Sequence, residues 1–147
     1  MACGGDDPPA TPAACSDAPD TVIAGLSRGR CFGSCPAYDI DVQKDGTLLY
    51  HGEAFVEQIG DRTGMIDAAT VEQLQQSFLD AGFYGFADLY DDVQATDLPS
   101  LELRFVCDGQ SKTVHVEGGD PSTPLAIPEL AERFDVLVDI EQFIGPP

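Results

Sequence analysis

The stretch "AYDIDVQKDGTLLYHGE", residues 37–53, decides the fold, because it predicts a β-hairpin without reference to the rest of the chain. Residues 37–43 alternate strictly between apolar and polar side chains, which is the pattern of a strand that buries one face. Residues 44–46 have the composition of a tight turn, and Gly46 can adopt the positive φ that such turns require. Residues 47–53 then form the returning strand.

The elements on either side of the hairpin extend it into a domain. A further strand is expected before it, and the β-rich residues after it continue the meander. Apolar residues at helical spacing then predict a helix. Two strands joined by a turn come next, and a last helix ends the domain. The expected elements outside the hairpin therefore span residues 21–28, 54–66, 67–83, 101–107, 111–117 and 127–144. This order predicts an α+β fold with a mostly antiparallel sheet (β-meander, helix, β-hairpin, C-terminal helix) and the helices packed on one face.

The N-terminal residues differ in composition from the rest of the 147-residue chain. Residues 1–20 are rich in Pro, Ala, Asp and Gly, which predicts a flexible tether, and residues 21–147 form a single domain. Ala2 precedes Cys3, and a polar segment follows, as at the start of a mature bacterial lipoprotein whose signal has been removed. We therefore expect Cys3 to be a lipid attachment site and the domain to lie in the bacterial cell envelope, on its periplasmic or surface side. The alternative is a cytosolic protein that happens to begin in this way.

The charge of the chain limits its partners. It carries 26 Asp and Glu against seven Lys and Arg, for a net charge of −19. So acidic a surface repels nucleic acid and anionic lipid, which leaves an unidentified protein or small ligand as partner and the lipid on Cys3 as the contact with the membrane. The acidity is either an adaptation to salt or a functional acidic face. No apolar run approaches the roughly 20 residues that a membrane span needs.

The five cysteines indicate two disulfides. Without Cys3, four cysteines remain, and an even count in an envelope protein favours pairing, although four allow three connectivities. Cys31 and Cys35 can form a small ring that would fix the entry to the following strand. By elimination, Cys15 would then pair with Cys107 and anchor the tether. We interpret the CxxxC bridge as structural.

The alternative interpretation is a thiolate pair that binds copper or performs thiol redox chemistry. The run from Cys31 to Cys35 and the following proline resemble the CxxxCP copper site of Sco-type cytochrome oxidase assembly proteins, and His51 or His115 would complete a Cu(I) site. Sco-type proteins have a thioredoxin-like fold, whereas this chain begins with a β-meander. Zinc fits less well, because neither the Cys nor the His spacing follows the usual pairs.

Other signals for a ligand or a reaction are weaker. An oxygen-rich loop that could hold Ca²⁺ contains Asp88, Asp91, Asp92 and Asp97, but the spacing does not follow an EF-hand. The chain has no GxSxG, P-loop, HExxH or dinucleotide-binding motif. We therefore expect no cofactor and no enzymatic activity.

Three motifs together resemble a bacterial family of unknown function. They are a CFGxCPxY motif at residues 31–38, a G-x-x-x-Y-x-G hairpin at 46–52 and a TD-x-P motif at 96–99, and the resemblance runs from about residue 21 to 144. Many members begin with a lipoprotein signal, so the resemblance implies this fold and an envelope location but no particular reaction. Cys15 and Cys107 lie outside the motifs, which supports a separate pair. The expected function is a non-catalytic binding or structural module.

Overall fold

The predicted hairpin lies between an edge strand and the central strand of the sheet in the computed structural model, which describes residues 15–92 and 98–146. Strands β2 (Ala37–Gln43) and β3 (Thr47–Ala54) pair antiparallel, with Ile40 opposite Tyr50. Gly46 in the turn has a φ of 94°, a conformation that side chains disfavour. Local alternation and turn chemistry were therefore sufficient to predict this hairpin.

Within the described residues, seven strands form one sheet in the order β4-β3-β2-β1-β6-β7-β5. Neighbouring strands pair antiparallel except β5 and β7, which are parallel. The mixed α+β fold with a mostly antiparallel sheet is thereby confirmed. The remaining elements are β1 (Val22–Arg28), β4 (Gly60–Met65), α1 (Ala68–Asp80), the 3₁₀ helix η1 (Phe83–Gly85), β5 (Leu89–Tyr90), β6 (Leu101–Cys107), β7 (Gln110–Val116), α2 (Ala126–Leu137) and α3 (Glu141–Ile144).

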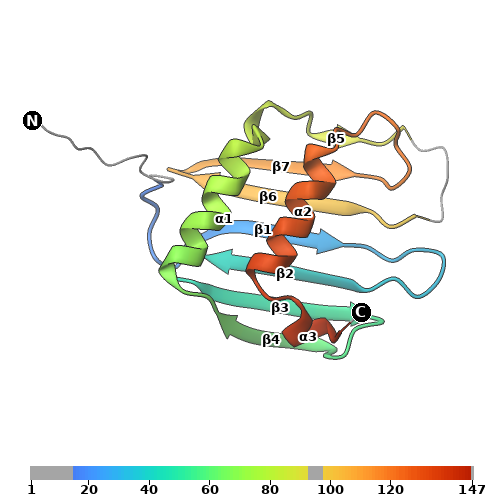
Figure 1. The fold of residues 1–147 in the computed structure, drawn as a ribbon, viewed down its shortest axis with the longest axis horizontal. Helices are drawn as coiled ribbons and strands as arrows, with labels where there is room; N and C mark the ends of the chain where they lie inside the picture. Colours follow the sequence, from blue (N-terminus) through green and yellow to red (C-terminus); the bar gives the residue numbers. More distant parts are fainter. Residues whose placement is uncertain (1–14, 93–97, 147) are drawn as a thin grey trace, which may run out of the picture.

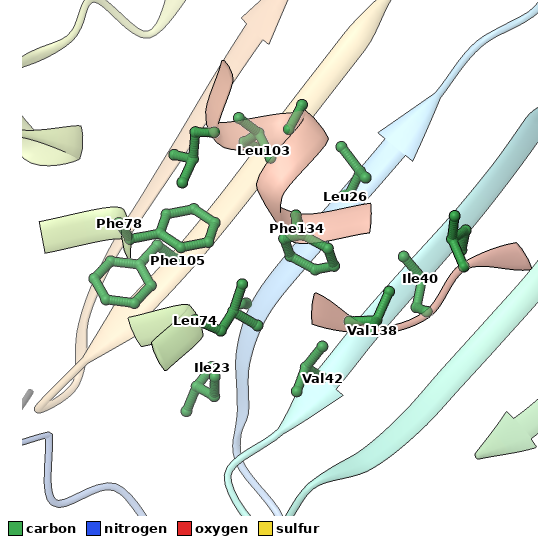
Figure 2. Packing of buried hydrophobic residues seen from close by; sticks show 14 of the residues in the cluster. Ile23, Leu26, Ile40, Val42, Leu74, Phe78, Leu103, Phe105, Phe134 and Val138 are labelled. Atoms are coloured by element: carbon green, nitrogen blue, oxygen red, sulfur yellow. The ribbon is translucent and has the colours of Figure 1, made fainter. Parts of the chain in front are cut away.

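Helices α1 and α2 run side by side across the same face of the sheet (Figure 1). The core lies between the two layers, where Phe78 of α1 stacks on Phe105 of β6 with ring centroids 4.6 Å apart. Phe134 of α2 meets Phe78 edge-on at 6.2 Å, and Figure 2 shows the three rings together. Asp67 begins α1, because its carboxylate accepts a hydrogen bond from the Thr70 amide at 2.8 Å.

The prediction of one helix over residues 127–144 is wrong in its second half. Helix α2 ends at Leu137, and the chain turns through Asp139, whose φ is 53°, before the short α3. The turn allows Phe143 to stack on Tyr50 of β3 at 4.4 Å. A straight helix would carry Phe143 past the sheet, so burial of this ring favours the break.

The residues preceding β1 belong to the folded part of the chain. Cys15 is 5% exposed and contributes to the core, and the backbone from residue 18 to 21 bonds to the β2–β3 turn region. Residues 15–20 of the predicted 1–20 tether therefore contact the domain, whereas residues 1–14 lie outside the described part. No helix among the described residues combines the length and apolarity needed to span a bilayer.

Candidate functional site at the loop end of the sheet

The two ends of the sheet differ in the connections between strands that lie there (Figure 1). At one end, which we call the loop end, β1, β3 and β7 finish, and the connections 29–36, 55–59 and 117–125 lie there with residues 98–100. At the other end, which we call the hairpin end, tight turns join β2 to β3 and β6 to β7. Long irregular loops on a rigid sheet are the usual location of binding residues, so the loop end is the candidate site.

A disulfide closes the most prominent of these loops. Cys31 and Cys35 are joined with an S–S distance of 1.99 Å and a Cα–Cα distance of 5.7 Å. Phe32 lies between them and is 89% exposed. The disulfide loop therefore presents an aromatic side chain to solvent.

Few contacts hold the rest of this loop. The Gly29 amide donates a hydrogen bond to the Ser100 carbonyl at 3.0 Å, and a Cβ on Gly29 would lie 2.2 Å from the Ser100 hydroxyl oxygen. A larger residue at position 29 would require the Ser100 hydroxyl to rotate away. Arg30 pairs with Glu53 of β3, Nε to Oε2, at 3.2 Å, and both side chains are at least half exposed. The loop is therefore connected to both of its neighbours at the loop end.

Further apolar side chains are exposed at the loop end. Phe55 begins the β3–β4 loop, is 57% exposed and has a φ of 56°, an unfavourable conformation for an aromatic residue. Such backbone strain is retained only where the surrounding structure imposes it. The exposed apolar residues in these connections are Phe32, Phe55, Ile59, Leu98 and Leu125.

Beneath the disulfide loop, a partly buried ionic cluster fixes α2 to the sheet. Arg28 at the end of β1 donates to Asp135 Oδ2 through Nη2 at 2.7 Å and through Nε at 3.1 Å. The Tyr38 hydroxyl donates to the other oxygen, Asp135 Oδ1, at 2.8 Å. Burial raises the pKa of Asp135, against the attraction of Arg28, and burial also raises the pKa of Tyr38. The cluster places the CFGxCPxY tyrosine under the candidate site.

Removing the charge from this cluster is expected to destabilise the fold. In Asp135→Asn, the Arg28 guanidinium, whose side chain is 28% exposed, loses its counter-ion while the shape of the site is kept. We expect the free energy of unfolding at pH 7 to fall by about 2 kcal/mol, measured by urea denaturation. Tyr38→Phe, which removes one hydroxyl and no charge, serves as the control at about 1 kcal/mol. Equal losses in the two variants would contradict an ionic role for Asp135.

The second disulfide lies at the hairpin end. Cys15 and Cys107 are joined at an S–S distance of 2.06 Å across a sequence separation of 92. Ser16 and Asp17, next to Cys15, hydrogen-bond to Asp108 and Gly109 in the β6–β7 turn at 2.7 to 2.9 Å. Both disulfides expected from the sequence are therefore present. Cys3, the predicted lipid attachment site, lies outside the described residues.

The structure does not assemble the alternative copper site. Both histidines lie on the sheet face opposite the helices, where His51 Nδ1 contacts Asp61 Oδ1 at 2.6 Å and His115 Nε2 contacts Glu117 Oε2 at 2.6 Å. These hydrogen bonds to carboxylates raise the pKa of each histidine. Across residues 15–92 and 98–146, no three His, Cys, Asp or Glu side chains are grouped so as to hold a metal. The fold therefore does not bring together the residues that the sequence suggested as copper ligands.

The acidic loop proposed for Ca²⁺ is not assembled in its described part either. Asp88 is 2.5 Å from Lys112 Nζ, and Asp91 and Asp92 are exposed, while the Asp92 amide donates to Asp120 Oδ2 at 3.0 Å. Asp97 lies outside the described residues. The Asp88–Lys112 contact fixes β5 beside β7 and gives this carboxylate a structural role.

A shallow groove runs between α1 and α2 on the outer side of the helices. It has a volume of about 610 Å³ and contains the Gln76–Asp80 hydrogen bond at 2.8 Å and the contact of Arg133 with Ser77 at 3.3 Å. Some of the polar groups that line the groove therefore already form hydrogen bonds with one another. The groove is less distinctive than the loop end, where apolar side chains are held in solvent.

Two features of the candidate site were missed in the sequence. Phe32 gives no signal in the sequence beyond its place between two pairable cysteines, because periodicity does not tell whether a single aromatic residue in a loop is exposed. Arg28 and Asp135 are 107 residues apart, and no local pattern links them. Only the packing of α2 against the end of β1 brings the two charges together.

Comparison with known proteins identifies the family but names no reaction. The comparison with curated proteins gives no match. The model of a family described as a domain of unknown function, DUF6438, matches residues 23–138, from the first strand of the sheet to the end of α2. The matched region contains the Cys31–Cys35 loop, the Arg28–Tyr38–Asp135 cluster and all the strands described above. The chain therefore belongs to the DUF6438 family.

Proposed function

We propose that the chain is a non-catalytic binding module of the bacterial cell envelope, anchored by a lipid on Cys3, which binds a protein partner through the loop end. The observation that carries the proposal is that the segment at Cys15, which follows Cys3 in the chain, and the exposed apolar residues lie at opposite ends of the sheet. The Cys15–Cys107 disulfide fixes the N-terminal segment at the hairpin end, and Phe32 and Phe55 are exposed at the loop end.

The disulfides support the envelope location. Disulfide bonds form and persist in oxidising compartments and are rare in the bacterial cytosol. Two cysteine pairs at bonding distance, one of them part of the core, favour a protein that folds outside the cytosol. Cys15 follows Cys3 by 12 positions (15 − 3 = 12), a separation that spans at most about 40 Å when fully extended. A lipid on Cys3 would keep the hairpin end within about 40 Å of the membrane, and the loop end lies at the far end of the sheet from this attachment.

The surface of the loop end favours a protein as the partner. Exposed aromatic residues are typical of interface centres, because they bury a large apolar area while losing little conformational entropy. The net charge of −19 favours a partner that is basic around this contact. A partner with an apolar pocket and a basic rim would match both properties.

The proposal is tested in the native host with a photo-crosslinking phenylalanine analogue at position 32, 55 or 63. We expect ultraviolet irradiation of cells to give the same adduct of discrete mass from positions 32 and 55. Position 63, an exposed threonine of β4, is the control and should give no such adduct. Intact mass of the membrane-extracted protein should show an acylated Cys3, and Cys3→Ser should release the chain from the membrane fraction.

Binding at the loop end and the lipid anchor on Cys3 are tested by different results. Adducts that are equally strong from position 63, or absent from 32 and 55, would contradict binding at the loop end. An unmodified Cys3 in protein from the native host would contradict the lipid anchor.

A further inference from the structure

The two disulfides lie in very different surroundings, and this contrast has a chemical consequence. Cys15 is 5% exposed in the core and its partner Cys107 is partly exposed at the edge of the core, while Cys31 and Cys35 are both partly exposed in a loop at the opposite end of the sheet. A disulfide that a dissolved thiol can reach exchanges, whereas a buried one is protected. Exposure alone therefore favours reaction at Cys31–Cys35.

The fold holds the buried pair together independently of its S–S bond. Ser16 and Asp17 bond to the β6–β7 turn, and Lys44 Nζ donates to the Cys15 carbonyl at 2.5 Å. If the bond between Cys15 and Cys107 were reduced, these contacts would keep the two sulfurs adjacent. A high local concentration of one thiol beside the other favours the oxidised form, so this disulfide should resist reductant.

The loop pair has much less support. Among the described residues, the hydrogen bond within the ring runs from the Gly33 amide to the Cys31 carbonyl at 3.0 Å, so it does not connect the ring to the sheet. The contacts to the sheet are those of Gly29 and of Arg30, on the N-terminal side of Cys31. After reduction, Cys35 could move away from Cys31. Reduction would therefore increase the conformational freedom of the Cys31–Cys35 loop, whereas it would not do so for the segments that hold Cys15 and Cys107.

Two neighbours of the loop disulfide suit it to exchange with another protein. The Arg30 guanidinium, adjacent in sequence to Cys31, is exposed and favours a thiolate at the moment when the disulfide opens. Phe32 is 89% exposed between the two cysteines, so a protein that reaches either sulfur must contact this ring. An aromatic contact beside a reactive disulfide would orient a large substrate and would matter little to a small one.

We propose that Cys31–Cys35 is a redox-active disulfide that oxidises a dithiol of another protein, with Phe32 as the contact surface for that substrate. A thiolate of the substrate attacks one sulfur of the disulfide, the S–S bond breaks, and the other sulfur leaves as a thiolate and takes up a proton. The second thiolate of the substrate then attacks the mixed disulfide and releases the first cysteine. Two electrons pass from the substrate dithiol, which becomes a disulfide, to Cys31 and Cys35, which become thiols.

The first test compares the two disulfides within one molecule. The oxidised protein is equilibrated with increasing dithiothreitol at pH 7, trapped with N-ethylmaleimide and mapped by peptide mass. We expect Cys31 and Cys35 to be half reduced at a concentration on the order of tenfold below that needed for Cys15 and Cys107, while the circular dichroism stays native. Reduction of both pairs together, or of the loop pair only on unfolding, would overturn the proposal.

The second test concerns Phe32 and uses reduced thioredoxin as the protein dithiol. We expect Phe32→Ala to slow reduction of the loop disulfide by thioredoxin at least about fivefold and to leave its reduction by dithiothreitol unchanged, because only the larger reductant buries the ring. Met65→Ala, which removes a 66% exposed apolar side chain of β4 at the hairpin end, is the control and should leave both rates unchanged. Equal effects of Phe32→Ala on the two reductants would contradict the contact surface.

This inference goes beyond the proposed binding role and can fail without it. A loop disulfide that resists dithiothreitol would remove the redox activity. The adducts from positions 32 and 55 in cells would still decide whether the loop end binds a partner.

Discussion

Replacing both cysteines of the buried disulfide, in Cys15→Ala with Cys107→Ala, is expected to lower the free energy of unfolding by about 4–5 kcal/mol. The bond joins residues with a sequence separation of 92, so in the unfolded chain it closes a loop of most of the domain. Chain-entropy estimates of disulfide stabilisation rise with the length of that loop. The loss would be a large part of the 5–15 kcal/mol that typical domains possess.

The measurement is urea denaturation at pH 7 followed by far-ultraviolet circular dichroism. The matched control is Cys31→Ala with Cys35→Ala, which opens a ring with a sequence separation of only 4 and should cost about 2 kcal/mol. The difference between the two double variants is the informative quantity, because both remove one disulfide. If the loop variant lost as much stability as the core variant, the assignment of the main structural role to Cys15–Cys107 would be wrong.

The second large effect is expected at the centre of the core. Phe78 is fully buried, stacks on Phe105 and meets Phe83 and Phe134 edge-on, with centroid distances of 4.6 to 6.2 Å. Phe78→Ala would leave a cavity where both helices meet the sheet (Figure 2). We expect a loss of about 3–5 kcal/mol in the free energy of unfolding.

The same urea titration measures this effect, and Phe78→Leu is its control. Leucine keeps most of the apolar volume and removes the ring contacts, so its loss should be about 1–2 kcal/mol. A Phe78→Ala protein no less stable than Phe78→Leu would mean that the core collapses around the missing ring. Both helices would then be less firmly held by this residue than the packing indicates.

The effects expected at the loop end are smaller, and the reason is structural. Phe32 and Phe55 are largely exposed, so truncating either removes little buried area from the domain. Changes at these positions should therefore alter binding or thiol exchange while leaving the fold intact. This separation makes the loop end suitable for functional variants.

The sequence by itself determined the elements whose cause is local. Alternation over residues 37–43, the turn at 44–46 and the helical spacing of apolar residues within 67–83 predicted a hairpin and a helix that the structure contains. The short spacing of Cys31 and Cys35 allowed their bridge, and elimination then led to the other pair. Each of these inferences depends on residues close together in the chain, or on a small count of cysteines.

Tertiary structure alone decided the features that depend on distant residues. The placement of β6 beside β1, the turn at Asp139 and the pairing of β5 with β7 follow from which apolar surfaces are buried together, and periodicity does not encode this. The same holds for the meeting of Arg28 with Asp135. It holds equally for the separation of the two disulfides to opposite ends of the sheet, because each loop's position depends on the order of all the strands.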